Sequence, residues 1–292
     1  MAVREPERRT FLSQGLSLSY LDWDNAEASP LLLLHGNKDH ARSWDPVASE
    51  LAQHFRVIAL DLRGHGDSAW SPDGAYLSSY NLLDIVNLLD LLGPGPAVLM
   101  GHSFGGNIAA RVAAAFPEKV SRLALVDGFG PPPAAYVNWA RDGGVKRTRE
   151  WVTQQRTAAS RQPRLLARIE DGAERLMAGN PLLPADRALE LARHGLRQVG
   201  EGFAWKYDPL VGPFVAEEFL VDNADEVWRD VTCPTLLCYG EKSWNTNPEL
   251  DGRAQRLRDF RVVEIAEAGH WPHQEQVGAF LGVLRDFLGK VA

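Results

Sequence analysis

The chain has 292 residues, of which 45% are hydrophobic and 24% are charged, so it can bury a folded core, and disorder as its main state is excluded. Its 31 Lys and Arg against 38 Asp and Glu give a net charge of −7, which opposes binding to nucleic acid or to anionic membrane surfaces. The charged N-terminus lacks the apolar stretch of a secretory signal, and no apolar run approaches the roughly 18 residues of a membrane span. We therefore expect a cytoplasmic protein.

Strand and helix patterns alternate through the first 127 residues. Residues 16–23 alternate apolar and polar, which predicts a strand at an exposed edge of a sheet, whereas residues 31–34 are uniformly apolar, as in a strand covered on both faces. Further strands are expected at 56–61, 97–101 and 120–127, and helices at 44–53, 79–92 and 103–115. This alternation predicts a parallel sheet with right-handed crossovers.

The alternation stops at Gly128. Three prolines at 131–133 cannot continue a strand ladder, and residues 131–228 read as several helices separated by Gly and Pro. Strands then resume at 234–240 and 260–266, followed by a helix at 274–288. We therefore expect a core formed by residues 1–130 and 229–292, with residues 131–228 as an inserted helical cap.

The expected cap is rich in aromatic and basic residues. It contains Trp139, Trp151, Trp205 and Trp228, and residues 141–175 hold nine Lys and Arg against five acids. One interpretation is an aromatic lid over an apolar substrate that can carry an anionic group. The other is that the tryptophans pack the cap helices together while the basic residues form a solvated face, and for any single residue this second interpretation is favoured.

A candidate nucleophile lies between an expected strand and an expected helix, in the sequence Gly101-His102-Ser103-Phe104-Gly105. The G-x-S-x-G pattern in this context places the serine in strained backbone at the tip of the strand, where its neighbours must lack bulky Cβ groups. The serine then begins a helix, so the N–H of Phe104 and the positive end of the helix dipole point at an oxyanion formed there.

A serine nucleophile needs a general base, and the chain has eight histidines. His40, His54, His194 and His273 fall in helical or surface stretches, His65 lies in a glycine-rich turn, and His102 is too close in sequence to fold back onto Ser103. His270 follows the last expected strand, in a loop that emerges at the same carboxyl edge of the sheet as Ser103. We therefore predict that His270 is the base.

These motifs resemble the α/β-hydrolase family. The sequence His35-Gly36-Asn37, the turn from Arg63 to Ser68, the pentapeptide at 101–105 and Gly269-His270 occur in that family's order. The resemblance implies a mostly parallel eight-stranded sheet with helices on both faces and an inserted helical cap. It also implies that Asn37 supplies the second backbone N–H of an oxyanion hole, beside that of Phe104.

The acid of the triad departs from the family's commonest pattern. Many relatives carry an aspartate three residues past a glycine that follows the seventh strand, where this chain has Ser243. A carboxylate is needed to orient the histidine and to stabilise its charged form. Asp127 ends the sixth strand, where some relatives place the acid, so we expect it to be Asp127, with Glu241 as the alternative.

Ser103 also bears on the reaction class, because haloalkane dehalogenases and epoxide hydrolases use an aspartate at this position. The expected function is a serine hydrolase that cleaves a carboxylic ester or lactone of a small, largely apolar molecule, without a metal or organic cofactor. Two alternatives remain: hydrolysis of a carbon–carbon bond in a vinylogous diketone, and a non-catalytic ligand sensor of the same fold. Cys233 and Cys238 are five residues apart on an expected strand, so we expect neither a disulfide nor a metal site. The sequence leaves the substrate's identity and the oligomeric state open.

Overall fold

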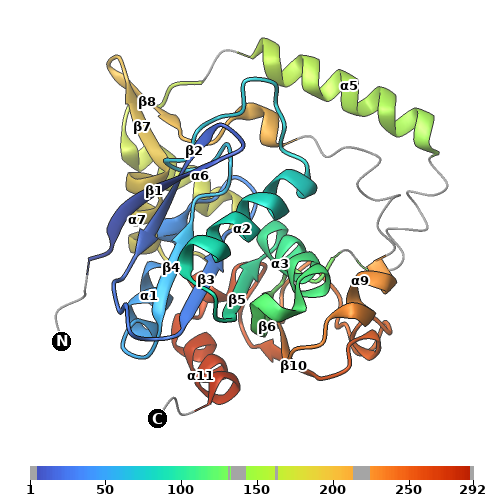
Figure 1. The fold of residues 1–292 in the computed structure, drawn as a ribbon. Coiled ribbons are helices and arrows are strands. Elements are labelled where there is room, and N and C mark those ends of the chain that lie inside the picture. Colours follow the sequence, from blue (N-terminus) through green and yellow to red (C-terminus); the bar gives the residue numbers. More distant parts are fainter. Residues whose placement is uncertain (1–4, 131, 133–142, 162–163, 213–223, 290–292) are drawn as a thin grey trace.

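The computed structural model describes residues 5–130, 132, 143–161, 164–212 and 224–289. An eight-stranded sheet in the order β1-β2-β4-β3-β5-β6-β9-β10 runs through the molecule (Figure 1). The strands from β4 to β10 pair in parallel, and β2 pairs antiparallel with β1 and β4. The mostly parallel eight-stranded sheet is therefore confirmed. The bounds are β1 Glu7–Ser13, β2 Leu16–Asp22, β3 Pro30–Leu34, β4 Arg56–Leu60, β5 Ala97–His102, β6 Val120–Val126, β9 Thr235–Gly240 and β10 Phe260–Ile265.

Helices cover both faces of the sheet. Successive side chains of a strand point to opposite faces, so Leu32 of β3 packs into one hydrophobic core cluster and Leu33 into the other. This explains the uniformly apolar sequence of β3, because both of its faces are buried. One face carries α2 (Ser78–Leu92), α3 (Phe104–Ala115) and α9 (Ala224–Asp230), and the other carries α1 (Asp45–Leu51) and α11 (Val277–Leu288).

The edge of the sheet differs from the prediction. Residues 16–23 were expected to form an exposed edge strand, but β2 lies inside the sheet and its residues from Leu18 to Asp22 are buried. The edge is formed by β1, whose sequence ERRTFLS is largely charged and exposed. Charged side chains are typical of edge strands, where they oppose pairing with another chain. Because these charges interrupt the apolar pattern by which a strand is recognised, the sequence did not predict β1.

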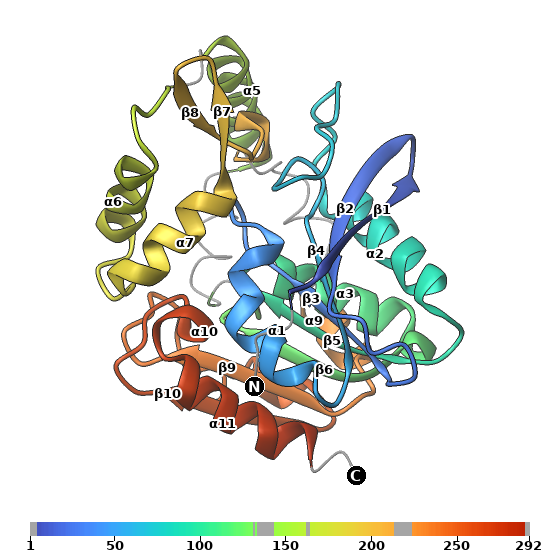
Figure 2. The ribbon, with the colours of Figure 1, turned by 90° about the vertical axis from the view of Figure 1, so that its left-hand side faces the viewer.

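A separate group of elements is inserted in the chain between β6 and β9 and is drawn at the upper left of Figure 2, with α11 at the bottom. It has its own hydrophobic cluster, which includes Leu166, Leu183 and Leu191. Helices were expected throughout, but the structure also contains an antiparallel hairpin of β7 and β8, turned at Gly200 with φ +57°. The described elements are α5 Gly144–Ser160, α6 Ile169–Gly179, α7 Ala185–Gly195, β7 Leu196–Val199, β8 Gly202–Trp205 and the 3₁₀ turn η3 Pro209–Val211.

The tryptophans of the expected cap fall in different places. Trp205 ends β8 and Trp151 lies in α5, whereas Trp139 lies outside the described residues. Trp228 lies in α9 and packs edge-on against Phe129, with ring centroids 6.5 Å apart, in the core beside α3. Trp228 therefore belongs to the core face of the sheet and not to a lid.

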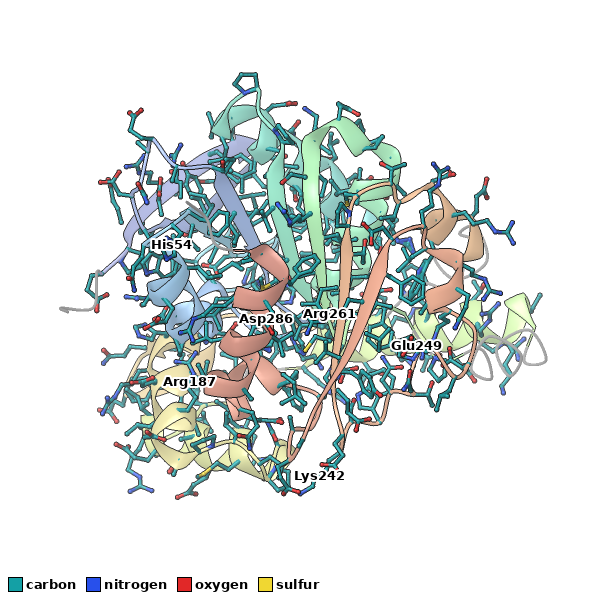
Figure 3. All side chains as sticks on the ribbon, turned by 90° about the horizontal axis from the view of Figure 1, so that it is seen from below. His54, Arg187, Lys242, Glu249, Arg261 and Asp286 are labelled. Atoms are coloured by element: carbon teal, nitrogen blue, oxygen red, sulfur yellow. The ribbon has the colours of Figure 1, made fainter. Side chains whose placement is uncertain are left out.

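Polar contacts hold the inserted elements against the core. Arg187 of α7, labelled in Figure 3, donates to the backbone carbonyls of Arg42 (3.1 Å) and Ser43 (2.7 Å) in the 3₁₀ turn η1, Ala41–Trp44. His40 Nε2 donates to the Leu191 carbonyl of α7 at 3.0 Å. These contacts hold α7 above the carboxyl edge of the sheet.

Within the described segments, no helix combines the length and the apolar character that crossing a membrane requires.

Candidate active site

Ser103 lies in a sharp turn between β5 and α3. Its backbone angles are φ +51° and ψ −116°, a conformation that is rare for residues other than glycine and that stores strain. The turn is tightly packed: a Cβ on Gly105 would lie 2.5 Å from the His35 carbonyl oxygen, and one on Gly128 would lie 2.7 Å from that of Ser103. The strained backbone expected from the pentapeptide is confirmed.

Three side chains that are distant in the sequence meet at this turn. His270 follows β10, and its Nε2 lies 3.0 Å from Ser103 Oγ. Its other ring nitrogen, Nδ1, lies 3.3 Å from Oδ2 of Asp127, the residue directly after β6. The structure therefore brings together Ser103, His270 and Asp127 in the order of a nucleophile, a base and an acid.

Asp127 is held in an unusual environment for a carboxylate. Its side chain is fully buried, and among the described residues neither of its oxygens makes a well-aligned hydrogen bond. The approach to His270 is thus close enough for an ion pair, although its angles fall short of a hydrogen bond. The backbone of Asp127 has φ +46°, and its N–H donates to the Cys238 carbonyl at 2.7 Å. Among the described residues, His270 is therefore the basic group that lies within ion-pair distance of this carboxylate.

The alternative acid lies elsewhere. Glu241 is exposed, and its Oε2 accepts a hydrogen bond from the backbone N–H of Glu267 at 2.9 Å. Ser243, at the position where many relatives carry the acid, accepts a hydrogen bond from the Asn245 N–H at 3.1 Å. In this conformation Asp127 approaches the imidazole, whereas Glu241 caps a neighbouring loop.

The loop that carries His270 is supported from two sides, by residues that no sequence motif marks. Glu275, in α10 (Pro272–Glu275), is buried and accepts hydrogen bonds from the backbone N–H groups of Gly269 and Trp271, on either side of His270. His102 donates from Nε2 to the His270 carbonyl at 2.8 Å. Burial lowers the pKa of His102 well below its usual value, so this ring stays neutral. His102 thus reaches the base rather than its neighbour Ser103.

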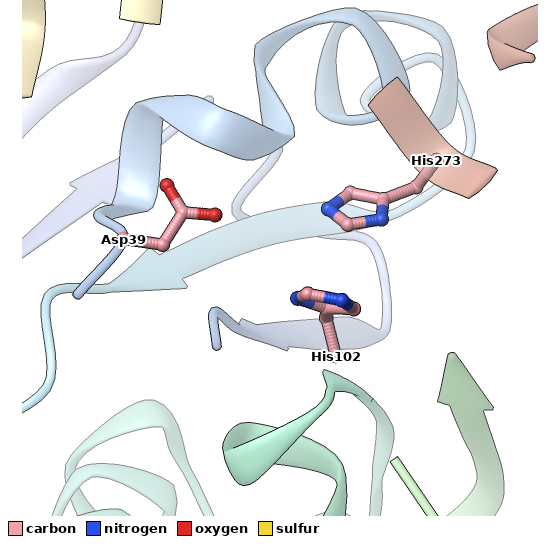
Figure 4. Close-up of side chains that lie close together, drawn as sticks. All are labelled: Asp39, His102 and His273. Carbon is pink, nitrogen blue, oxygen red and sulfur yellow. The ribbon is translucent and has the colours of Figure 1, made fainter. Parts of the chain in front are cut away.

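His102 also belongs to the group of described residues that comes nearest to a metal site, together with Asp39 and His273 (Figure 4). Their candidate ligand atoms lie within 4.8 Å of one another, whereas ligands about 2.0–2.1 Å from a tetrahedral zinc lie about 3.3 Å apart. Gln274 Nε2 already lies 3.1 Å from Asp39 Oδ2 and 3.3 Å from His273 Nε2. We interpret this group as packing support beneath the His270 loop. His40 and His273, assigned to helical or surface stretches, are both buried.

The two expected oxyanion donors flank Ser103. Phe104 begins α3, directly after Ser103. Gly36 packs against the elbow, since a Cβ there would lie 3.2 Å from Ser103 Cβ, and this places Asn37 beside it. His35 fixes the shape of this loop, because its Nε2 accepts the Leu62 N–H at 3.0 Å and its Nδ1 lies 2.7 Å from the Gly36 carbonyl.

A cavity of about 280 Å³ opens beside these residues. Its lining includes Asn37 and Trp271, the residue that follows His270, together with residues of α6 and α7 and Trp205, but not Ser103 or His270 themselves. The volume is near the lower end of the range for small-molecule sites. Trp244, which the sequence analysis did not single out, lies over His270 with ring centroids 5.1 Å apart and is 63% exposed.

The fold and this arrangement define an α/β hydrolase with a serine at the elbow. The model of the alpha/beta hydrolase family matches residues 31–282, and the chain belongs to this family. It is therefore an enzyme of the hydrolase class.

Its relatives include several hydrolases. The chain is 40% identical to the lipase LipV of Mycobacterium tuberculosis over 273 residues, which cover 89% of this chain and 93% of the lipase. It is 27% identical to the 2-(acetamidomethylene)succinate hydrolase of Mesorhizobium japonicum over 286 residues, which cover 95% of each chain. Among solved structures, a hypothetical protein of Pseudomonas aeruginosa superposes with a TM-score of 0.82 at 27% identity, over 97% of this chain and 99% of the other.

Proposed function

We propose that this enzyme cleaves a carboxylic ester or lactone of a small, largely apolar molecule through an acyl-enzyme on Ser103. The observation that carries the proposal is the contact of His270 with Ser103 Oγ on one side (3.0 Å) and with Asp127 on the other (3.3 Å). A serine hydroxyl becomes a nucleophile when an oriented base takes its proton. The lipase and esterase names of its relatives favour ester substrates.

In the proposed reaction, Ser103 Oγ attacks the carbonyl carbon while His270 Nε2 takes its proton. The N–H groups of Asn37 and Phe104 hold the resulting oxyanion, and the imidazolium is stabilised by Asp127. His270 then gives its proton to the leaving alcohol, which departs and leaves the acyl group on Ser103. Water activated by the same imidazole hydrolyses the acyl-enzyme and releases the acid.

The residues around the triad suit this cycle. The neutral His102 and the carboxylate of Glu275 hold the backbone of the His270 loop, so the imidazole keeps its position between its two partners. Preorganised groups of this kind stabilise charge in the transition state without reorganisation at the moment of reaction.

A fluorophosphonate probe tests the nucleophile directly. Folded protein is expected to be labelled at Ser103, as located by peptide mass spectrometry, and to hydrolyse short phenyl esters. Ser103→Ala is expected to lose both labelling and turnover while keeping its melting temperature. Ester hydrolysis that survives at the full rate in Ser103→Ala would remove the proposed mechanism.

A further inference from the structure

Two basic side chains line the cavity beside the candidate active site. Lys38 follows Asn37 in the loop after β3, and Arg175 lies on α6 of the inserted region. Arg175 is one of the nine basic residues of segment 141–175, and it lines the cavity together with Leu176, Leu183, Leu191, Trp205 and Trp271. The core and the insertion therefore each contribute one cation to an otherwise largely apolar pocket.

Among the residues that the structure describes, neither cation has an ion-pair partner. In the described part of the chain, no carboxylate lies within 4.0 Å of Lys38 or Arg175, although other basic residues near the cavity, such as Arg187 and Lys206, have such a partner. Lys38 is exposed and Arg175 is half-buried, so water solvates both charges when no ligand is bound. An unpaired pair of cations in a concave site is suited to an anionic ligand group.

The Tyr207 ring lies near both cations. Lys38 Nζ lies 6.0 Å from the centre of its ring, and the positive charge of Arg175 also acts on its phenol. The ring is stacked on Trp205 of the cavity wall, with centroids 6.0 Å apart and an interplanar angle of 17°. Burial raises the pKa of Tyr207, so its hydroxyl stays protonated and can donate a hydrogen bond.

The other titratable groups that line the cavity offset only part of this positive charge. Burial lowers the pKa of His40 to about 3, so that His40 is neutral. Asp39 is the acid of the cavity wall, and burial raises its pKa to about 6. Its two oxygens accept hydrogen bonds from the His40 N–H (2.8 Å) and from Gln274 Nε2 (3.1 Å). With this pKa Asp39 is mostly ionised at pH 7, so it offsets one of the two positive charges and the lining keeps the other.

We propose that the substrate of this enzyme carries a free carboxylate, which Lys38 and Arg175 bind while its apolar part lies against the leucines and tryptophans of the cavity. This inference rests on the proposed ester hydrolysis at Ser103, and it names the substrate class as esters or lactones that retain an acid group. The carboxylate can belong to the acyl half or to the alcohol half of the ester, and matched substrates distinguish the two.

Three phenyl esters make the test. Phenyl pentanoate is neutral, monophenyl glutarate replaces its terminal methyl group with a carboxylate, and para-carboxyphenyl pentanoate moves the carboxylate to the alcohol half. For each ester, kcat and KM are compared between the wild type, Lys38→Met and Arg175→Met, so that differences in intrinsic reactivity cancel. Arg193→Met is the matched control, because Arg193 is exposed on α7 and lies outside the cavity wall.

In Lys38→Met and in Arg175→Met, KM for one carboxylated ester is expected to rise at least about tenfold more than KM for phenyl pentanoate, as expected for a lost charge-assisted hydrogen bond. The ester that responds identifies the half of the substrate that enters the cavity. High ionic strength is expected to weaken the preference of the wild type. Equal effects on all three esters, or an effect of Arg193→Met as large as that of Arg175→Met, would overturn the inference and leave ester hydrolysis standing.

Calorimetry separates this outcome from failure of the proposed function. Glutarate is titrated into Ser103→Ala, with and without Arg175→Met, so that no turnover is required. Binding that is lost in the double variant supports the carboxylate site even if none of the esters is hydrolysed. No binding to Ser103→Ala, together with equal KM values for the neutral and charged esters, would refute it.

Discussion

Replacing Asp127 with asparagine is the sharpest test of the proposed triad. The Asp127 carboxylate is fully buried, 3.3 Å from His270 Nδ1. For unit charges at this distance and an effective dielectric constant of about 20, the attraction is about 5 kcal/mol. Because about 1.4 kcal/mol corresponds to a tenfold change in rate, losing it when His270 becomes charged should lower kcat by about three to four powers of ten. The aspartate of a serine protease triad contributes on a similar scale, about 10⁴.

The assay compares kcat for a short phenyl ester in the wild type, Asp127→Asn and Glu241→Gln, with circular dichroism melting curves for all three. The asparagine side chain has nearly the same shape as that of aspartate, so the fold of Asp127→Asn is expected to survive. Glu241→Gln alters the exposed competitor and is expected to stay within about twofold of the wild type, as for a surface substitution of about 0.5 kcal/mol or less. A large loss in Glu241→Gln, with Asp127→Asn nearly unaffected, would show that the argument from distance and burial is wrong.

Three further predictions concern the surroundings of the site. In Glu275→Gln, the amide oxygen still accepts one hydrogen bond from the His270 loop, but the amide N–H faces the other backbone N–H. We therefore expect kcat to fall about tenfold or more with KM nearly unchanged, whereas the control Glu267→Gln, at an exposed position, should have little effect. Arg187→Met leaves the carbonyls of Arg42 and Ser43 without their hydrogen-bond donor, so the free energy of unfolding should fall by about 2–3 kcal/mol, as measured by thermal melting. Arg193→Met is the control, and equal melting temperatures for the two variants would contradict this prediction. The free energy of unfolding should fall as the pH drops below about 6.5. Five buried histidines have lowered pKa values in the folded state, so the unfolded state binds more protons there, and this effect outweighs the opposite effect of three aspartates with raised pKa values. A free energy of unfolding that rises between about pH 6.5 and 4.5 would refute this prediction. The histidines are His35, His40, His65, His102 and His273, and the aspartates are Asp39, Asp45 and Asp61.

The sequence predicted those parts of the fold in which local pattern and burial agree. The central strands β3 and β5 are buried on both faces, so their apolar runs are unambiguous. At the margins the agreement ends: β1 is a charged edge strand, and the strands of the β7–β8 hairpin are four residues long and partly exposed. Such segments owe their conformation to pairing with a neighbour, which no local pattern records.

The same distinction applies to the site. The elbow at Ser103 is encoded locally, because its glycines are required by contacts within a few residues and by the close approach of β3. The support that His102 gives to His270 is not encoded locally, because the two residues lie 168 positions apart and the contact is to a backbone carbonyl. Lys38 and Arg175 likewise line one cavity only because the insertion folds against the core. Segment 141–175 contains nine basic residues, and only the three-dimensional structure shows that Arg175 is the one that lines the cavity.

The position of the proposed acid, Asp127, is explained by the order of the strands. β6 and β9 are parallel neighbours, with Val126 paired to Cys238, so the residues after both strands emerge at one point of the sheet edge. A carboxylate after either strand can therefore reach the same imidazole, and the sheet tolerates a move of the acid from one strand end to the other. In this chain the N–H of Asp127 is bonded to Cys238 of the neighbouring strand, and Ser243 is engaged with its own loop. The ends of β6 and β9 are equivalent positions for the acid only because the two strands pair in the sheet. A family pattern that is defined by spacing along the chain does not contain this information.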